Sequence, residues 1–195
     1  MANDLKGPGG YVSTGDVATV NDAVPLFAPG QLGIFLPTLD DLPVTGSTVA
    51  LGATQIPRVC QYVQLSAASA APVQGQCLTW LDSLNFIVTT VASNTTGQNR
   101  IAGVLLNASA TLGNYVWIGV SGVFPLLCTG SAPANGSSVH GTGNAAGEWG
   151  FTAAGTAGTA QIVGSFLGAK AAAFNGVTPG ANVAFGLINI PRFGN

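Results

Sequence analysis

The feature that most restricts the fold of this chain is the alternation of short apolar runs with tight-turn residues. One pair of runs flanks Asp82-Ser83 and another flanks Gly113-Asn114. Asp, Asn, Ser and Gly favour tight turns, whereas β-branched and aromatic residues favour strands. The pattern therefore predicts antiparallel strands over residues 58–128. The runs are Val59–Leu65, Cys77–Leu81, Leu84–Val91, Ile101–Leu106 and Tyr115–Val120.

These runs are apolar on both faces, as expected of strands buried in a small barrel or sandwich. We therefore expect an all-β fold, a small antiparallel β-barrel or β-sandwich, over residues 58–195. Its aromatic side chains should contribute to one core, and the candidates are Trp80, Phe86, Tyr115 and Trp117.

Prolines separate residues 1–57 from this domain, since six of the eleven prolines lie there. Proline lacks an N–H and has a fixed φ, so both a helix and a central strand are disfavoured. An extended N-terminal arm on a partner's surface fits these features, and edge strands on the arm's own domain fit them too. We expect residues 1 to about 40 to bury more surface against other chains than against their own domain. The candidate partner-binding side chains are Leu26, Phe27, Leu32, Ile34, Phe35 and Leu36.

Residues 129–160 consist almost entirely of Gly, Ala, Ser, Thr and Asn, with Glu148 as the only acidic or basic residue apart from His140. Such a composition has little to bury, so it predicts a long surface loop or sprawling strands. Trp149 and Phe151 are the exceptions, and we expect them to anchor this segment.

Charged residues are scarce: they make up 6% of the chain, against about 25% in ordinary soluble domains. Disorder does not explain this, because 47% of the residues are hydrophobic and disordered chains are poor in such residues. Few charges remain to keep a monomer soluble, and surfaces poor in Lys and Glu are typical of protein contacts. We therefore expect a homo-oligomer, with a trimer as the favoured form.

The same composition argues against two kinds of partner. Only five Lys and Arg residues are present and they are scattered, so no basic stripe can neutralise phosphates of a nucleic acid. The uncharged stretch Ile101–Cys128 is long enough to span a bilayer. Asn107, Gly113 and Asn114 interrupt it, however, and indicate a hairpin rather than a membrane helix. The N-terminus lacks the apolar segment of a signal peptide, so synthesis in a cytoplasm is expected.

Motifs for catalysis and cofactor binding are missing from the sequence. The single histidine, His140, lies in a polar segment that favours a solvated loop residue over a catalytic base. Asp40 and Asp41 are adjacent and point apart, and Gly141–Gly147 has the wrong spacing for a phosphate loop. The three cysteines are widely spaced and lack a metal-binding pattern, which favours buried thiols. We expect a protein that is not an enzyme and binds no metal or cofactor; the cysteines are Cys60, Cys77 and Cys128.

An internal repeat is visible as I-x-G-x-x-L-x-A followed by V-x-x-G-[VL]. The first copy comprises Ile101–Ala108 and Val116–Val120, and the second comprises Ile162–Ala169 and Val183–Leu187. The repeat predicts two similar hairpins, with glycines where neighbouring strands approach closely.

The stretch from Ile101 to Val123, with its Gly103-Val104 and Gly113-Asn114-Tyr115-Val116-Trp117 segments, is similar to a signature of tailed-bacteriophage head decoration (cement) proteins. Gly75–Trp80 takes the place of the strand that precedes the signature, and the resemblance covers roughly residues 58–190. It implies a small β-barrel or sandwich on the exterior of the virion capsid, bound to the major capsid protein. No catalytic residues come with it.

Two other functions fit the same residues. One is a phage fibre or tail adhesin that binds host surface glycan through the Gly/Ser/Thr-rich loop, and the other is a shell or tail-tube component. A decoration protein should approach the major capsid protein in abundance, whereas an adhesin should not.

Overall fold

A computed structural model describes residues 19–35, 58–90, 101–128, 133–134, 136–141, 147–152, 162–170 and 182–190. These residues form strands and connecting segments, and no helix occurs among them. The predicted all-β class is therefore confirmed. The strands are β1 (Leu32–Phe35), β2 (Arg58–Leu65), β3 (Cys77–Asp82), β4 (Ile87–Thr89), β5 (Ile101–Leu105), β6 (Tyr115–Leu127), β7 (Ser138–His140), β8 (Gly150–Thr152), β9 (Ile162–Lys170) and β10 (Val183–Asn189).

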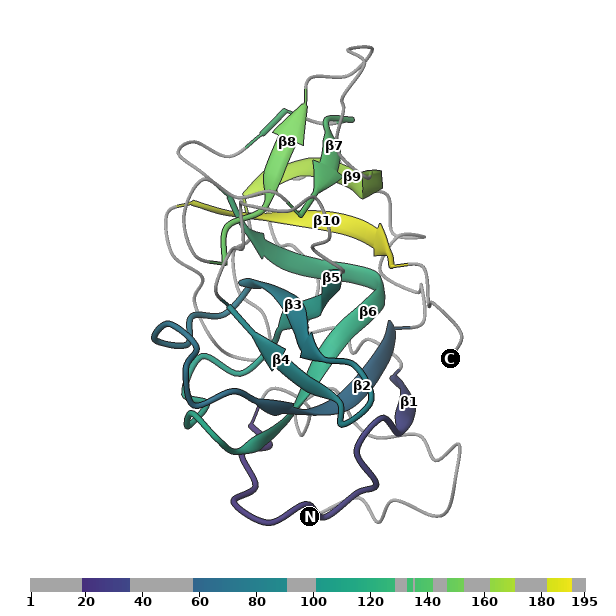
Figure 1. Cartoon of the computed structure of the whole chain (residues 1–195). Coiled ribbons are helices and arrows are strands. Elements are labelled where there is room, and N and C mark those ends of the chain that lie inside the picture. The colour runs from purple at the N-terminus through teal and green to yellow at the C-terminus, as the bar shows by residue number, and fades with distance from the viewer. Residues whose placement is uncertain are drawn as a thin grey trace.

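Five strands close into a barrel, which occupies the lower half of Figure 1. Their order is β2-β4-β3-β5-β6, and β6 pairs back with β2 to complete the ring. Barrels with so few strands have room inside only for side chains, so the interior is a packed core. The buried cluster that includes the inward-facing residues consists of Val63, Leu65, Leu78, Val88, Ala102, Leu105, Ala110, Val116, Ile118 and Val120.

Strand β6 belongs to the barrel and to a second sheet. Its first half, Tyr115–Ser121, pairs with β2, and its second half, Ser121–Leu127, pairs with β10. From β10 the second sheet continues through β9 and β7 to β8, which lie in the upper half of Figure 1. The long apolar run of β6 is therefore paired with another strand from end to end, first with β2 and then with β10.

The prediction of one aromatic core is wrong, because the two faces of the barrel strands contribute to two buried clusters. Trp117 belongs to the larger cluster, in which outward-facing barrel residues pack with β9 and β10, and Tyr115 packs against it. Trp80 and Phe86 pack instead against the cluster of the barrel interior. Along β6, Tyr115 and Trp117 alternate with Val116 and Ile118 of the interior cluster, so these two aromatic side chains lie on the opposite face of the strand.

Two details of strand pairing also differ from the prediction. β2 and β4 are parallel, so the barrel is not antiparallel throughout. The run Leu84–Val91 does not form a strand along its whole length, since residues 83–86 form the turn and β4 begins at Ile87. The Asp82 carboxylate accepts hydrogen bonds from the backbone N–H groups of Leu84 (3.0 Å) and Asn85 (3.2 Å), which holds these residues in the turn.

The two repeated segments both form antiparallel pairs, β5 with β6 and β9 with β10. A Cβ atom on Gly103 would lie 2.6 Å from the carbonyl oxygen of Gly119 on the paired strand. A Cβ atom on Gly164 would likewise collide with the carbonyl oxygen of Leu187. The glycines therefore lie where strands approach closely, as the repeat predicts.

The segment of residues 129–160 is described only in part, and the described part contains β7 and β8. Trp149 is fully buried and donates a hydrogen bond from Nε1 to the carbonyl oxygen of Gly75 (2.8 Å). Phe151 is 37% exposed and contacts Phe166 edge-to-face. Trp149 thus anchors this segment on the barrel.

Candidate interaction surface

The apolar side chains of the predicted arm fall into two groups, and the first group packs on the chain's own barrel. Phe35 on β1 is fully buried, with its ring 5.5 Å from that of Trp117. The Phe27 ring lies 5.1 Å from Tyr62 and 5.4 Å from Trp117. In this structure Phe27 and Phe35 therefore contribute to the chain's own core.

The second group faces outward. Leu26 is 72% exposed and Ile34 is 41% exposed, while Leu32 is partly buried. Because β1 pairs with β2 at the edge of the sheet, this part of the arm adopts the edge-strand alternative. Leu36 and the predicted boundary at residue 57 lie outside the described residues, and a partner role for Leu26 and Ile34 stays a prediction.

A cradle of polar groups, which we define as residues 107–115, holds residues 20–22 against the barrel. Asn21 donates from Nδ2 to Thr111 Oγ1 (3.0 Å), and its Oδ1 accepts from the Thr111 N–H (2.9 Å) and from Asn114 Nδ2 (3.1 Å). Asn107 Nδ2 donates to the carbonyl oxygen of Val20 (3.0 Å). These bonds join residues about 90 positions apart, so no local pattern could have indicated them.

Tyr62 connects the same segment to β2. Its hydroxyl donates to Asp22 Oδ2 (2.5 Å) and accepts from the Leu26 N–H (3.3 Å). Burial, together with the hydrogen bond to Asp22, raises the pKa of the Tyr62 hydroxyl well above its ordinary value. Asp22 also exchanges backbone hydrogen bonds with Tyr115 (3.0 and 2.8 Å). The segment is therefore fastened by backbone and side-chain contacts together.

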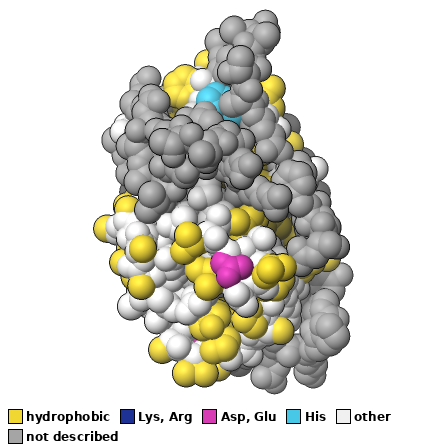
Figure 2. Space-filling view, viewed as in Figure 1, with side chains coloured by type: hydrophobic (Ala, Val, Ile, Leu, Met, Phe, Trp, Pro, Cys, Tyr) yellow, Lys and Arg dark blue, Asp and Glu magenta, His cyan; other side chains and the backbone are white. Residues whose placement is uncertain are grey.

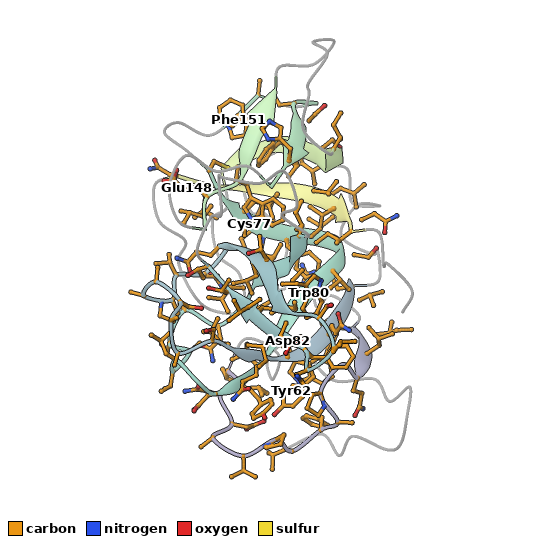
Figure 3. All side chains as sticks on the ribbon, viewed as in Figure 1. Tyr62, Cys77, Trp80, Asp82, Glu148 and Phe151 are labelled. Carbon is orange, nitrogen blue, oxygen red and sulfur yellow. The ribbon has the colours of Figure 1, made fainter. Side chains whose placement is uncertain are left out.

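The turn between β3 and β4 carries a second group of exposed apolar side chains, which we name the hairpin tip (Leu81–Phe86). Leu81 is 60% exposed and Leu84 is 75% exposed. Figure 2 shows one acidic group among hydrophobic side chains on this face, and Figure 3 labels Asp82 on the same part of the barrel. Hydrogen bonds, first of all from the Asn85 side chain (2.7 Å), lower the pKa of the Asp82 carboxyl. The Asp82 carboxylate thus stabilises the turn to which it belongs.

The hairpin tip is held in a fixed conformation. Phe86 has a φ of 55°, in the left-handed region that a non-glycine residue rarely adopts. Its ring lies 6.2 Å from Trp80 and covers Gly30, where a Cβ atom would collide with the ring. This packing compensates for the strained backbone and leaves the two leucines directed outward.

No family model and no curated protein matches this chain. The function of the surface is therefore inferred from the side chains that it presents. Among residues whose side chains the structure describes, Arg58 is the only Lys or Arg, and it is buried, with Nε donating to the Val123 carbonyl oxygen (2.9 Å). The acidic residues in the described part of the chain are Asp22, Asp82 and Glu148, and all three are partly exposed.

Reactive groups are not concentrated anywhere in the described part of the chain. No group of three or more His, Cys, Asp or Glu residues there could hold a metal ion. Burial raises the pKa of the Cys77 and Cys128 thiols to about 12, and raises that of Cys60 further. These thiols are protonated at neutral pH and make poor nucleophiles. Within the described ranges, no helix is long and apolar enough to cross a membrane.

Proposed function

We propose that this chain is a structural virion protein that decorates a tailed-phage head and stabilises it by binding the outer surface of the major capsid protein lattice. The observation that carries the proposal is the hairpin tip, where Leu81 and Leu84 are exposed on a rigid turn of a closed barrel. Exposed apolar side chains on a surface poor in charge favour contact with another protein.

Binding through the hairpin tip is favourable for two physical reasons. Burial of a leucine side chain stabilises a complex by about 1.5–3 kcal/mol. The turn is already ordered by Asp82 and by the packing of Phe86, so little conformational entropy is lost on binding. A capsid lattice repeats the same binding site many times, which suits a small protein with one compact contact.

The first experiment is quantitative mass spectrometry of purified particles that contain the chain. A decoration protein should approach the major capsid protein in copy number. An abundance that is only a small fraction of the major capsid protein would contradict the proposal and favour the glycan-binding adhesin.

The second experiment compares Leu84→Ser with Val73→Ser in binding to particles stripped of the protein. Both residues are exposed, at 75% and 45%, but Val73 lies outside the hairpin tip. Loss of a buried leucine should weaken binding by at least about tenfold, because 1.4 kcal/mol corresponds to a factor of ten. Val73→Ser should bind as the unaltered protein does, and equal effects of the two variants would contradict a role for the hairpin tip.

A further inference from the structure

We propose that residues 19–35, which we call the docking segment, exchange between copies of this chain, so that the segment of one copy docks on the barrel of its neighbour. The occupant of the docking site on β2 and β6 is then a second copy of the same chain. This inference rests on the proposed function, because copies bound to a repeating capsid lattice lie near one another.

The length of the connection between β1 and β2 is the first observation. Phe35 and Arg58 pair directly in the sheet, so the two strands are adjacent where the connection begins and ends. Hairpins with adjacent strand ends commonly use 2–5 connecting residues, whereas residues 36–57 number 22 (58 − 35 − 1). Fully extended, 22 residues reach up to about 70 Å, more than the diameter of a small domain. The connection can therefore reach a neighbouring barrel.

The docking site is the second observation, because its contacts do not depend on which chain supplies the segment. Asn21 bonds to the polar cradle, Asp22 to Tyr62 and Tyr115, and Phe27 and Phe35 pack on Trp117. All of these contacts form equally well within one chain or between two. Exchange of an identical element between copies accordingly has a low energetic cost.

The exposed side chains of the docking segment are the third observation. Val24 is 71% exposed and Leu26 is 72% exposed when the segment lies on its own barrel. Exposed apolar side chains favour contact with another protein, and a second copy that receives the segment is such a protein. Neighbouring copies in an assembly are held at a high effective concentration, at which exchange competes with closure within one chain.

Disulfide cross-linking tests the exchange. Asp22 and Tyr115 form an antiparallel pair with two backbone hydrogen bonds of 3.0 and 2.8 Å, and the Cα atoms of such a pair are about 5.5 Å apart, within the range of a disulfide. Asp22→Cys and Tyr115→Cys proteins are prepared separately, mixed at a concentration at which sedimentation detects the oligomer, unfolded and refolded together, and treated with a mild oxidant. The native Cys60, Cys77 and Cys128 are buried and do not compete.

In the mixture a disulfide between positions 22 and 115 can only join two copies. We expect a covalent dimer on non-reducing gels, in excess of any dimer in either single variant oxidised alone. The double variant should form covalent multimers under the same conditions. Circular dichroism of each single variant checks that the β-structure is retained.

Two outcomes would overturn the inference. One is a mixture without excess dimer while the double variant forms only an intrachain disulfide, and the other is the absence of any oligomer up to millimolar protein. A closed copy can still decorate a capsid through its hairpin tip. Failure of the cross-link therefore differs from failure of the proposed function, which the copy number in particles tests separately.

Discussion

Single residues fix the separation of neighbouring strands in the two repeated hairpins. Gly103 and Gly164 occupy the same position in the two copies of the repeat, and each faces a backbone carbonyl of the next strand. Gly113 differs, because a Cβ atom there would meet nothing within 4 Å while its φ is 89°. Glycine is therefore required for two different reasons: Gly103 and Gly164 lack room for a side chain, whereas Gly113 needs a left-handed backbone conformation.

Gly103→Ala should be more destabilising than Gly113→Ala. The first substitution forces two strands apart, with a cost of about 3 kcal/mol as for an overpacked core. The second only places an L-residue in the left-handed region, with a cost of about 1–2 kcal/mol. Urea titration gives the free energy of unfolding of both variants, and an equal loss would contradict the close approach of Gly103 to Gly119.

The Tyr62 hydroxyl predicts a dependence of stability on alkaline pH. Its pKa is raised in the folded protein, so the unfolded state loses this proton at lower pH than the folded state does. The contribution to stability is present below the ordinary tyrosine pKa of about 10 and is lost as the pH rises above it.

Tyr62→Phe should therefore lower the free energy of unfolding at neutral pH by about 1–2 kcal/mol, through lost hydrogen bonds to Asp22 and Leu26. It should also flatten the decline in stability between about pH 9 and pH 11. Denaturation of both proteins across this range is the measurement. The buried thiols titrate in both proteins, so only the difference reports Tyr62, and parallel pH curves would contradict the assignment.

Among the elements, the strands with strong local patterns could be predicted from the sequence and their partners could not. Alternating apolar runs indicated β2, β3, β5 and β6, and the lone tryptophan of a polar segment indicated the burial of Trp149. The closure of β2 on β6, the parallel pairing of β2 with β4 and the polar cradle join residues far apart in the chain. Such pairings depend on tertiary packing, which one sequence does not display.

For strand β1, the sequence likewise indicates that the segment is apolar but does not indicate which of its side chains face the barrel. Its apolar character was evident, and alternation along a strand directs neighbouring side chains to opposite faces. Which face meets the barrel depends on register with β2, where Ile34 pairs with Val59 and Phe35 with Arg58. The sequence alone could therefore group Ile34 with Phe35 but could not separate their roles.

Phe35→Ala should destabilise the free chain by about 3–5 kcal/mol, since it leaves a cavity beside Trp117. Ile34→Ala is the matched control on the same strand and should change stability by less than about 1 kcal/mol, because Ile34 is 41% exposed. Thermal unfolding with tryptophan fluorescence measures both. If Phe35→Ala unfolds like the unaltered chain, β1 does not contribute to the core.

For the whole molecule, the scarcity of charge limits the kinds of contact through which copies can associate. The chain carries 5 basic and 7 acidic residues, a net charge of −2. Contacts among such copies involve apolar and neutral polar groups, which salt screens little, whereas ion pairs weaken as the ionic strength rises. Charge scarcity and exposed leucines together favour an oligomer that tolerates salt.

Sedimentation should detect a homo-oligomer at micromolar concentration, with a mass that is a multiple of 19.4 kDa. Its association should be unchanged or stronger when NaCl is raised from about 0.05 M to about 0.5 M. A stable monomer would contradict the expected oligomer, and dissociation on addition of salt would show that ion pairs hold the copies together.

The shared strand β6 also determines when the protein can fold during its synthesis. Both buried clusters include residues of Tyr115–Leu127, so neither is complete until this strand has left the ribosome. Before that point β2 and β5 each lack one of their two neighbouring strands, so the barrel is open and its apolar interior is exposed to water. The nascent chain therefore passes through a long interval in which it is prone to aggregate, and translation of β6 ends that interval for the barrel.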